Sequence, residues 1–226
     1  MKRCLLTIDN AFEDTTLIDR LYYLVNDADQ QVDTVDPLTS ASDLEERTYY
    51  PEIENIKRSL TKELWFDVLG DLTRGREELF KSFEIWSHCM ADAESVFSDN
   101  TQYGTINYHL DKDEDLFKRT KKISLPMYAS LTYIGPKEGV NGGELYVNTE
   151  GLSHATKYVA ENGELVDKLL DFGSGNWEKI NFKYNRVIVF DPTFPHLVAP
   201  VLRHPRKKRR ASIAINAWNS DELNKA

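Results

Sequence analysis

The sequence predicts an α+β protein that is mainly β, with helices in the first hundred of its 226 residues and an antiparallel sandwich or barrel over residues 101–218. Two observations lead to this prediction. In the second half, short β-branched runs follow one another between Gly and Pro turns, without helical spacers. In the first half, apolar residues recur at helical spacing. We expect one domain, residues 1–226, large enough to bury a core without disulfides.

The N-terminal part, residues 1–100, is expected to contain a strand, helices and a loop. Apolar residues spaced three or four apart predict helices over 53–64 and 79–90, which would pack on the outside of a sheet. Residues 26–48 are polar, acidic and poor in aromatics, which is typical of a long loop that is either a lid or disordered. We favour a lid, with Tyr49 and Tyr50 as substrate contacts. The alternative is that both tyrosines pack against the following helix.

The second half contains five predicted strands. Val, Ile, Tyr and Phe are concentrated in them, and these residues favour sheet. The runs are PMYASLTYIG (126–135), ELYV (144–147), RVIVFD (186–191), HLVAPV (196–201) and a strand that begins at Arg210.

Three residues have the spacing of a metal site. His109 and Asp111 are two apart in INYHLDKD, so in an extended strand both side chains project to one face. His196 opens a distant strand that must fold back to meet them. Two histidines and one carboxylate on one face of a metal are typical of non-haem Fe(II) oxygenases. Ligand chemistry alone suits Fe(II), Mn(II) and Zn(II) about equally.

A possible anion site follows on the next strand. Arg210 and Ser212 share a face there, and an inward guanidinium beside a hydroxyl can hold one carboxylate. Arg209 would point outward. Asn216 lies on the same face as Arg210 and is a candidate substrate contact. His88 and His154 are interpreted as hydrogen-bonded core residues instead.

The runs HLD, LTYIG with NGGELYV, NRVIVFDPTFPHLVAPV and RRAS, in that order, resemble the prolyl 4-hydroxylase-like Fe(II)/2-oxoglutarate-dependent oxygenases. The likeness covers roughly the last half of the chain. The opening IDNAFEDTTLIDRLYYLV is also similar to the first strand and helix of that family. The resemblance implies a double-stranded β-helix, a jelly-roll or cupin-like barrel, with supporting N-terminal helices.

The resemblance also implies a ligand set. His109, Asp111 and His196 would bind iron, and Arg210 would bind the distal carboxylate of 2-oxoglutarate, assisted by the hydroxyl of Tyr133. Ser212 is a comparable candidate for that carboxylate. Because RHPRKK lengthens the preceding turn, Arg209 remains an alternative to Arg210.

The implied chemistry is oxidative hydroxylation of a C–H bond, with Fe(II), 2-oxoglutarate and O2 required and ascorbate a further candidate. Succinate and CO2 would be released. An intact Asp111 favours hydroxylation or desaturation over halogenation. Two alternatives stay open: a cupin-like metal enzyme that does not use 2-oxoglutarate, and a non-catalytic binding module.

Charge and composition bear on partners and location. The net charge is −9, and acids follow the metal motif at 113–115 and recur in the 26–48 loop. Because a rim of one sign attracts ligands of the other, we expect a peptide or small-molecule substrate that is cationic. The alternative is that these acids only solvate loops. The basic run at 203–210 is expected to be a solvated turn, without nucleic acid. Two cysteines, no membrane segment and a poor signal sequence favour the cytoplasm.

Overall fold

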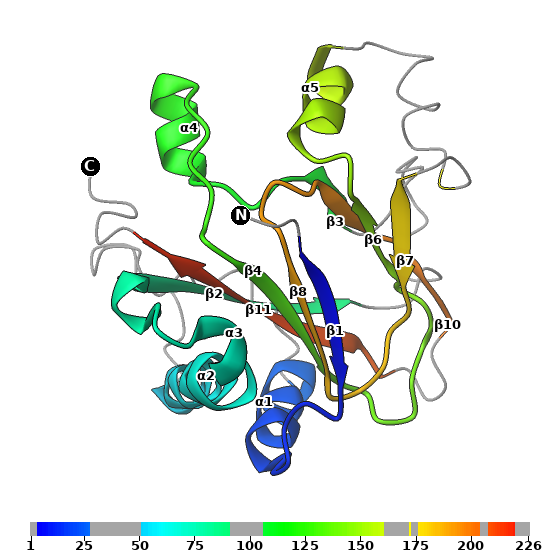
Figure 1. The fold of residues 1–226 in the computed structure, drawn as a ribbon. Coiled ribbons are helices and arrows are strands. Elements are labelled where there is room, and N and C mark those ends of the chain that lie inside the picture. Colours follow the sequence, from blue (N-terminus) through cyan, green and yellow to red (C-terminus); the bar gives the residue numbers. More distant parts are fainter. Residues whose placement is uncertain are drawn as a thin grey trace.

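The computed structural model describes residues 4–27, 51–90, 106–160, 172, 176–203 and 208–219. Its strands form antiparallel sheets, which are joined by few helices (Figure 1). The larger sheet has five strands, in the order β1 (Leu5–Asp9), β8 (Arg186–Phe190), β4 (Ala129–Gly135), β11 (Arg210–Trp218) and β2 (Ser82–Met90).

The smaller sheet has four strands, in the order β3 (Ile106–His109), β9 (His196–Val198), β6 (Leu145–Asn148) and β7 (Trp177–Ile180). A separate two-stranded sheet pairs β10 (Val201–Arg203) with β5 (Asn141–Gly142). In the sequence, β5 comes just before β6 and β10 just after β9. The helices are α1 (Thr16–Asp27), α2 (Pro51–Lys62), α3 (Gly70–Thr73), α4 (Glu114–Thr120) and α5 (Leu152–Ala160). A π-helical segment, Glu63–Val68, extends α2, and a short 3-10 turn, Glu77–Leu79, precedes β2.

The expected helix over 79–90 is wrong. Residues 82–90 form β2, which pairs with β11 along its whole length, so Cys89 is in a strand. The helix predicted over 53–64 is confirmed as α2 and the segment that continues it. The expected loop over 26–48 begins with the last turn of α1, and its other residues, like Tyr49 and Tyr50, lie outside the described part of the chain.

The larger sheet is covered on its outer face by α1, α2 and α3, which lie together on one side in Figure 1. In β8 the side chains of Val187 and Val189 pack with this helical layer, whereas Ile188 and Phe190 belong to a second cluster on the inner face. Both faces of the strand are therefore apolar, which is why its sequence shows no polar alternation.

The inner cluster is shared by the two sheets. Leu145, Val147 and Val198 of the smaller sheet pack with Leu131 and Ala214 of the larger sheet. The sheets thus face each other across a core, as in a β-sandwich. The polar residues of the candidate site lie on these inner faces.

Candidate metal centre and anion pocket

His109 and His196 meet because β3 and β9 are paired. The two residues are direct cross-strand partners, and their ring centroids are 4.3 Å apart. The pairing is irregular between Ile106 and His109, so these two residues face the same side although they are three apart. The irregularity directs His109 towards the inner face, where 35% of its side chain is exposed.

Asp111 reaches the same point from the segment just after β3. Its Oδ1 lies 3.6 Å from His109 Nε2 and 3.7 Å from His196 Nε2. Burial alone would raise the pKa of Asp111, but the two histidines and the Asn216 amide outweigh burial and hold it at about 2. The carboxylate is therefore ionised, the form that binds a metal.

His196 is oriented by the turn that precedes it. Asp191 accepts hydrogen bonds from the backbone N–H and the hydroxyl of Thr193, at 2.9 and 2.6 Å, which closes the turn. Nδ1 of His196 then lies 3.2 Å from the carbonyl oxygen of Phe194. Because that oxygen only accepts, Nδ1 carries the proton and Nε2 presents a lone pair. Burial and the His109 ring lower the pKa of His196 to about 4, so the ring is neutral at pH 7.

The predicted triad is thus assembled. One ligand atom from each of His109, Asp111 and His196 lies within 4.8 Å of the others. Within the described ranges, this is the group of His, Cys, Asp and Glu side chains that could hold a metal ion. Two imidazoles and one carboxylate leave further positions open on an iron or a similar metal.

Arg210 starts β11 and is completely buried. Its Nε donates to the Gly143 carbonyl oxygen at 3.0 Å, and its Nη1 contacts Met90 Sδ at 3.1 Å and Ser212 Oγ at 3.3 Å. The guanidinium also lies 4.9 Å from the centre of the Tyr133 ring. None of these direct partners carries a negative charge.

Two donors in this pocket have no acceptor in the described part of the chain. They are Nη2 of Arg210 and the hydroxyl of Tyr133, both buried. A buried donor without a partner is costly, and such a group often marks the place of a ligand. A carboxylate would satisfy both, so the pocket fits the anion that the sequence predicts.

Gly143 gives the guanidinium its room. A Cβ at this position would lie 2.7 Å from Cδ of Arg210, and the residue has a φ of +69°. The glycine is therefore needed for both its backbone conformation and its small size.

The structure separates Arg210 from Arg209. Arg209 lies on the α1 side of the sheet, where its carbonyl oxygen accepts from the Tyr22 hydroxyl and its N–H donates to Asn26 Oδ1. Residues 204–207 of the basic run lie outside the described residues, and Lys208 pairs with Glu138 at 2.8 Å.

Sequence reasoning missed part of the inner face because β2 was expected to be a helix. His88 is opposite Ser212 in the β2–β11 pairing and is half-buried beside the anion pocket. Burial and the charges of Arg210 and His109 lower the pKa of His88. Asn216 is fully buried and donates a hydrogen bond to Asp111, and its role as a substrate contact stays a prediction. His154 is a buried structural residue bonded to the Tyr108 hydroxyl, as expected.

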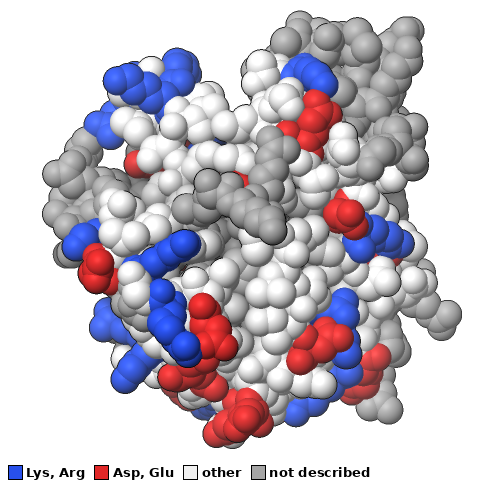
Figure 2. All heavy atoms as spheres, viewed as in Figure 1, with Lys and Arg blue, Asp and Glu red and all other residues white. Residues whose placement is uncertain are grey.

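Two of the acids after the metal motif, Asp113 and Glu114, have partners within the chain. Asp113 caps α4 by accepting from the backbone N–H of Leu116 at 2.8 Å, and Glu114 pairs with Lys112. Figure 2 shows Lys and Arg side chains gathered over α4, beside the hollow between α4 and α5. This region therefore carries both signs of charge.

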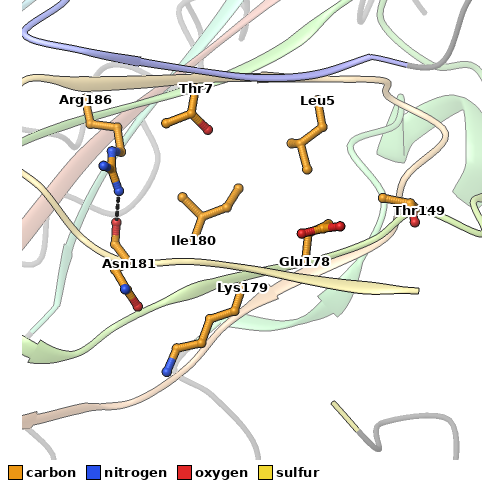
Figure 3. Close-up of a pocket in the computed structure, with 8 residues that line it drawn as sticks. All are labelled: Leu5, Thr7, Thr149, Glu178, Lys179, Ile180, Asn181 and Arg186. Atoms are coloured by element: carbon orange, nitrogen blue, oxygen red, sulfur yellow. Dashed lines mark hydrogen bonds between the residues drawn. The ribbon is translucent and has the colours of Figure 1, made fainter. Parts of the chain in front are cut away.

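A separate cavity of about 540 Å³ lies between β1, β7 and β8 (Figure 3). Its lining residues are Leu5, Thr7, Thr149, Glu178, Lys179, Ile180, Asn181 and Arg186. Arg186 is held by the Asn181 carbonyl oxygen at 2.8 Å and by Asp9. No member of the triad or of the anion pocket lines this cavity.

Two further findings concern the chain as a whole. No helix in the described ranges is both long and apolar enough to cross a membrane. Cys4 and Cys89 are both free thiols.

No family model and no curated protein matches the sequence. Among solved structures, a prolyl-4-hydroxylase from Pseudomonas putida is similar, with 15% identity, a TM-score of 0.50, and coverage of 96% of this chain and 86% of that one. A prolyl 4-hydroxylase structure from Phytophthora capsici matches with 17% identity and a TM-score of 0.50, over 97% of this chain and 60% of that one. These similarities establish a shared fold with prolyl 4-hydroxylases.

Proposed function

We propose that this protein is an Fe(II)- and 2-oxoglutarate-dependent dioxygenase that hydroxylates a C–H bond of a peptide, an amino acid or a small molecule. The observation that carries the proposal is the pairing of two sites on one inner surface. One is the triad of His109, Asp111 and His196, and the other is the buried Arg210 with its unsatisfied donor. A metal-binding triad beside an anion pocket is what a keto diacid co-substrate requires.

Each group has a defined role in this proposal. The triad would hold Fe(II), with the neutral His196 and the ionised Asp111 already in their binding forms. Arg210 and Tyr133 would bind the distal carboxylate of 2-oxoglutarate, and the Ser212 hydroxyl would orient the guanidinium. When bound, iron with 2-oxoglutarate and O2 supplies the oxidising power that converts C–H to C–OH, as succinate and CO2 leave.

The protein contributes orientation and exclusion of water. The inner cluster around Leu131, Val147 and Ile188 makes the surroundings of the site apolar, so charged contacts inside it are strong. The likeness of the fold to prolyl 4-hydroxylases supports this proposal. We also propose that the two sheets form a double-stranded β-helix. Two free thiols support a reducing compartment such as the cytoplasm.

The main test is anaerobic titration of the protein with Fe(II) and 2-oxoglutarate. We expect a weak visible charge-transfer band that needs both additions, and succinate release once O2 and a substrate are supplied. His196→Ala and Asp111→Ala should abolish the band. If it persists in both variants, the triad does not bind the iron.

Arg210→Ala separates this function from a metal enzyme that does not use 2-oxoglutarate. Losing a hydrogen bond to a charged group costs about 1.5–3 kcal/mol, so the Kd for 2-oxoglutarate should rise roughly ten- to hundredfold. Arg209→Ala, on the other face, is the matched control and should leave the Kd unchanged. Equal effects of the two variants would favour the cupin-like alternative, and absence of metal binding would favour a non-catalytic module.

A cationic substrate remains a prediction. Asp113 and Glu114 have partners within the chain, whereas most acids of the 26–48 loop lie outside the described residues. Succinate release with basic, neutral and acidic candidates, at low and high salt, tests the prediction. A preferred acidic substrate would contradict it.

A further inference from the structure

Asn216 connects the larger sheet to the metal site. It lies on the inner face of β11 and is completely buried. Its Nδ2 donates to Asp111 Oδ2 at 3.2 Å, and its Oδ1 accepts from the backbone N–H of Ser130 at 3.2 Å. A fully buried amide therefore bridges β4 and the carboxylate that follows β3.

The direction of this bridge is fixed by the backbone. A backbone N–H can only donate, so the side-chain oxygen of Asn216 must face Ser130 and its NH2 group must face Asp111. The hydroxyl of Ser130 also bonds the carbonyl oxygen of Ile215, which ties the two strands together beside the amide. A flip of the Asn216 amide would lose both the Ser130 contact and the Asp111 contact.

The two oxygens of Asp111 consequently have different surroundings. Oδ1 is the atom near both histidine Nε2 atoms, at 3.6 and 3.7 Å, whereas Oδ2 accepts the Asn216 bond. A carboxylate that used both oxygens would occupy one more position on the metal. Those positions are needed for a chelating co-substrate and for O2.

We infer that Asn216 is a positioning residue that restricts Asp111 to one-oxygen coordination of the metal. The inference rests on the proposed function only where it names 2-oxoglutarate and O2 as the ligands for the remaining positions on the metal. Its direct consequence concerns metal binding, which can be measured without turnover. Partners that orient metal ligands typically contribute roughly ten- to hundredfold to metal affinity.

The test compares Mn(II) binding to the wild type and to Asn216→Leu, which keeps a similar size but removes the donor. We expect the Kd of the variant to be roughly ten- to hundredfold higher. The Co(II) absorption spectrum should also change, because the coordination changes. The control is Asn185→Leu, since Asn185 is another buried asparagine, whose side chain accepts from the backbone N–H of Phe12 and donates to the carbonyl oxygen of Phe12. It should lower thermal stability and leave the Mn(II) Kd and the Co(II) spectrum unchanged.

A crystal structure of the wild type with Mn(II) gives a second, independent measurement if Asn216→Leu does not fold. One Asp111 oxygen on the metal and the other on Asn216 would support the inference. Both Asp111 oxygens on the metal, or an Asn216→Leu variant with the wild-type Mn(II) Kd and the wild-type Co(II) spectrum, would overturn the inference. If the wild type itself binds no Mn(II), the proposed function fails, which is a different outcome.

Discussion

Arg210 is a fully buried cation with one unsatisfied donor. Removing a guanidinium from water is expensive unless hydrogen bonds and an opposite charge compensate for it. The direct partners of Arg210 are a carbonyl oxygen, a thioether and a hydroxyl, all of them neutral. Burying the Arg210 guanidinium costs free energy during folding, and binding of an anion would offset that cost.

Gly143→Ala should damage this pocket. The new Cβ would lie 2.7 Å from Cδ and 3.0 Å from Nε of Arg210, so the side chain must shift. We expect the Kd for 2-oxoglutarate to rise at least about tenfold, the scale of one charged hydrogen bond. Gly139→Ala is the control, because Gly139 also has a positive φ but has no atom within 4 Å of the added Cβ. Calorimetric titration should show a loss of affinity for Gly143→Ala alone, and the same loss in both would indicate a backbone effect.

Stability of the metal-free protein should fall as the pH drops from 6.5 to 4. In the folded protein, burial and His109 lower the pKa of His196 from 6.5 to about 4. Between these values the unfolded chain takes up a proton that the folded chain does not, which favours unfolding by up to about 3 kcal/mol. Asp111, with a pKa of about 2, adds a loss at lower pH still.

Urea unfolding at a series of pH values checks this. His196→Gln removes the titrating ring, so its free energy of unfolding should depend less on pH over that window than that of the wild type. Parallel curves for the two proteins would show that His196 does not cause the dependence.

The residues of the candidate site were largely predictable, and for identifiable reasons. The spacing of His109 and Asp111 and the alternation of Arg210 and Ser212 are local patterns that survive folding. The bond between Asn216 and Asp111 was not predictable, because it joins residues that are distant in sequence. Tyr49 and Tyr50 stay predictions.

At the scale of elements, β2 shows where sequence patterns fail. Its side chains alternate between the helical layer, with Phe83 and Ile85, and the inner face, with Trp86 and Met90. Apolar residues therefore occur on both sides, and their spacing also matches a helix. Pairing with β11 decides the outcome, and a single sequence does not reveal a partner more than a hundred residues away.

β3 shows a smaller departure. The strand ends at His109, so Asp111 lies in the extended segment that follows rather than in the strand itself. The alternation argument still predicted correctly that both side chains reach one site. Strand ends are the least predictable part of an element, because the ladder hydrogen bonds that define them depend on the partner strand.

For the whole molecule, the main feature is that the candidate site is divided between the two sheets. The two histidines belong to the smaller sheet, whereas Arg210 and Tyr133 belong to the larger one. The apolar inner cluster packs between the sheets and sets their separation. Sequence patterns predicted the residues of each half, and only the packed structure sets how far apart the halves lie.

If the proposed function holds, the spacing between the two sheets selects the length of the co-substrate. Arg210 is held at one end by the Gly143 carbonyl oxygen, with no room to retreat, and the triad marks the other end. Under the proposed function, a keto diacid of the right length would bind with one end at Arg210 and the other at the triad. One with an extra methylene, such as 2-oxoadipate, must bend or displace packed side chains.

Comparing 2-oxoglutarate with 2-oxoadipate measures how strongly the protein selects co-substrate length. A single methylene in a fitted pocket changes kcat/KM by roughly 10- to 200-fold, and we expect a preference for the shorter acid in that range when CO2 release is followed. In Arg210→Ala the preference should shrink, because the guanidinium that holds the distal carboxylate is removed. Equal use of both acids by the wild type would show that the ends are not rigid. If the preference holds, co-substrate choice is set by the spacing of two sheets and not by any group at the reacting carbon.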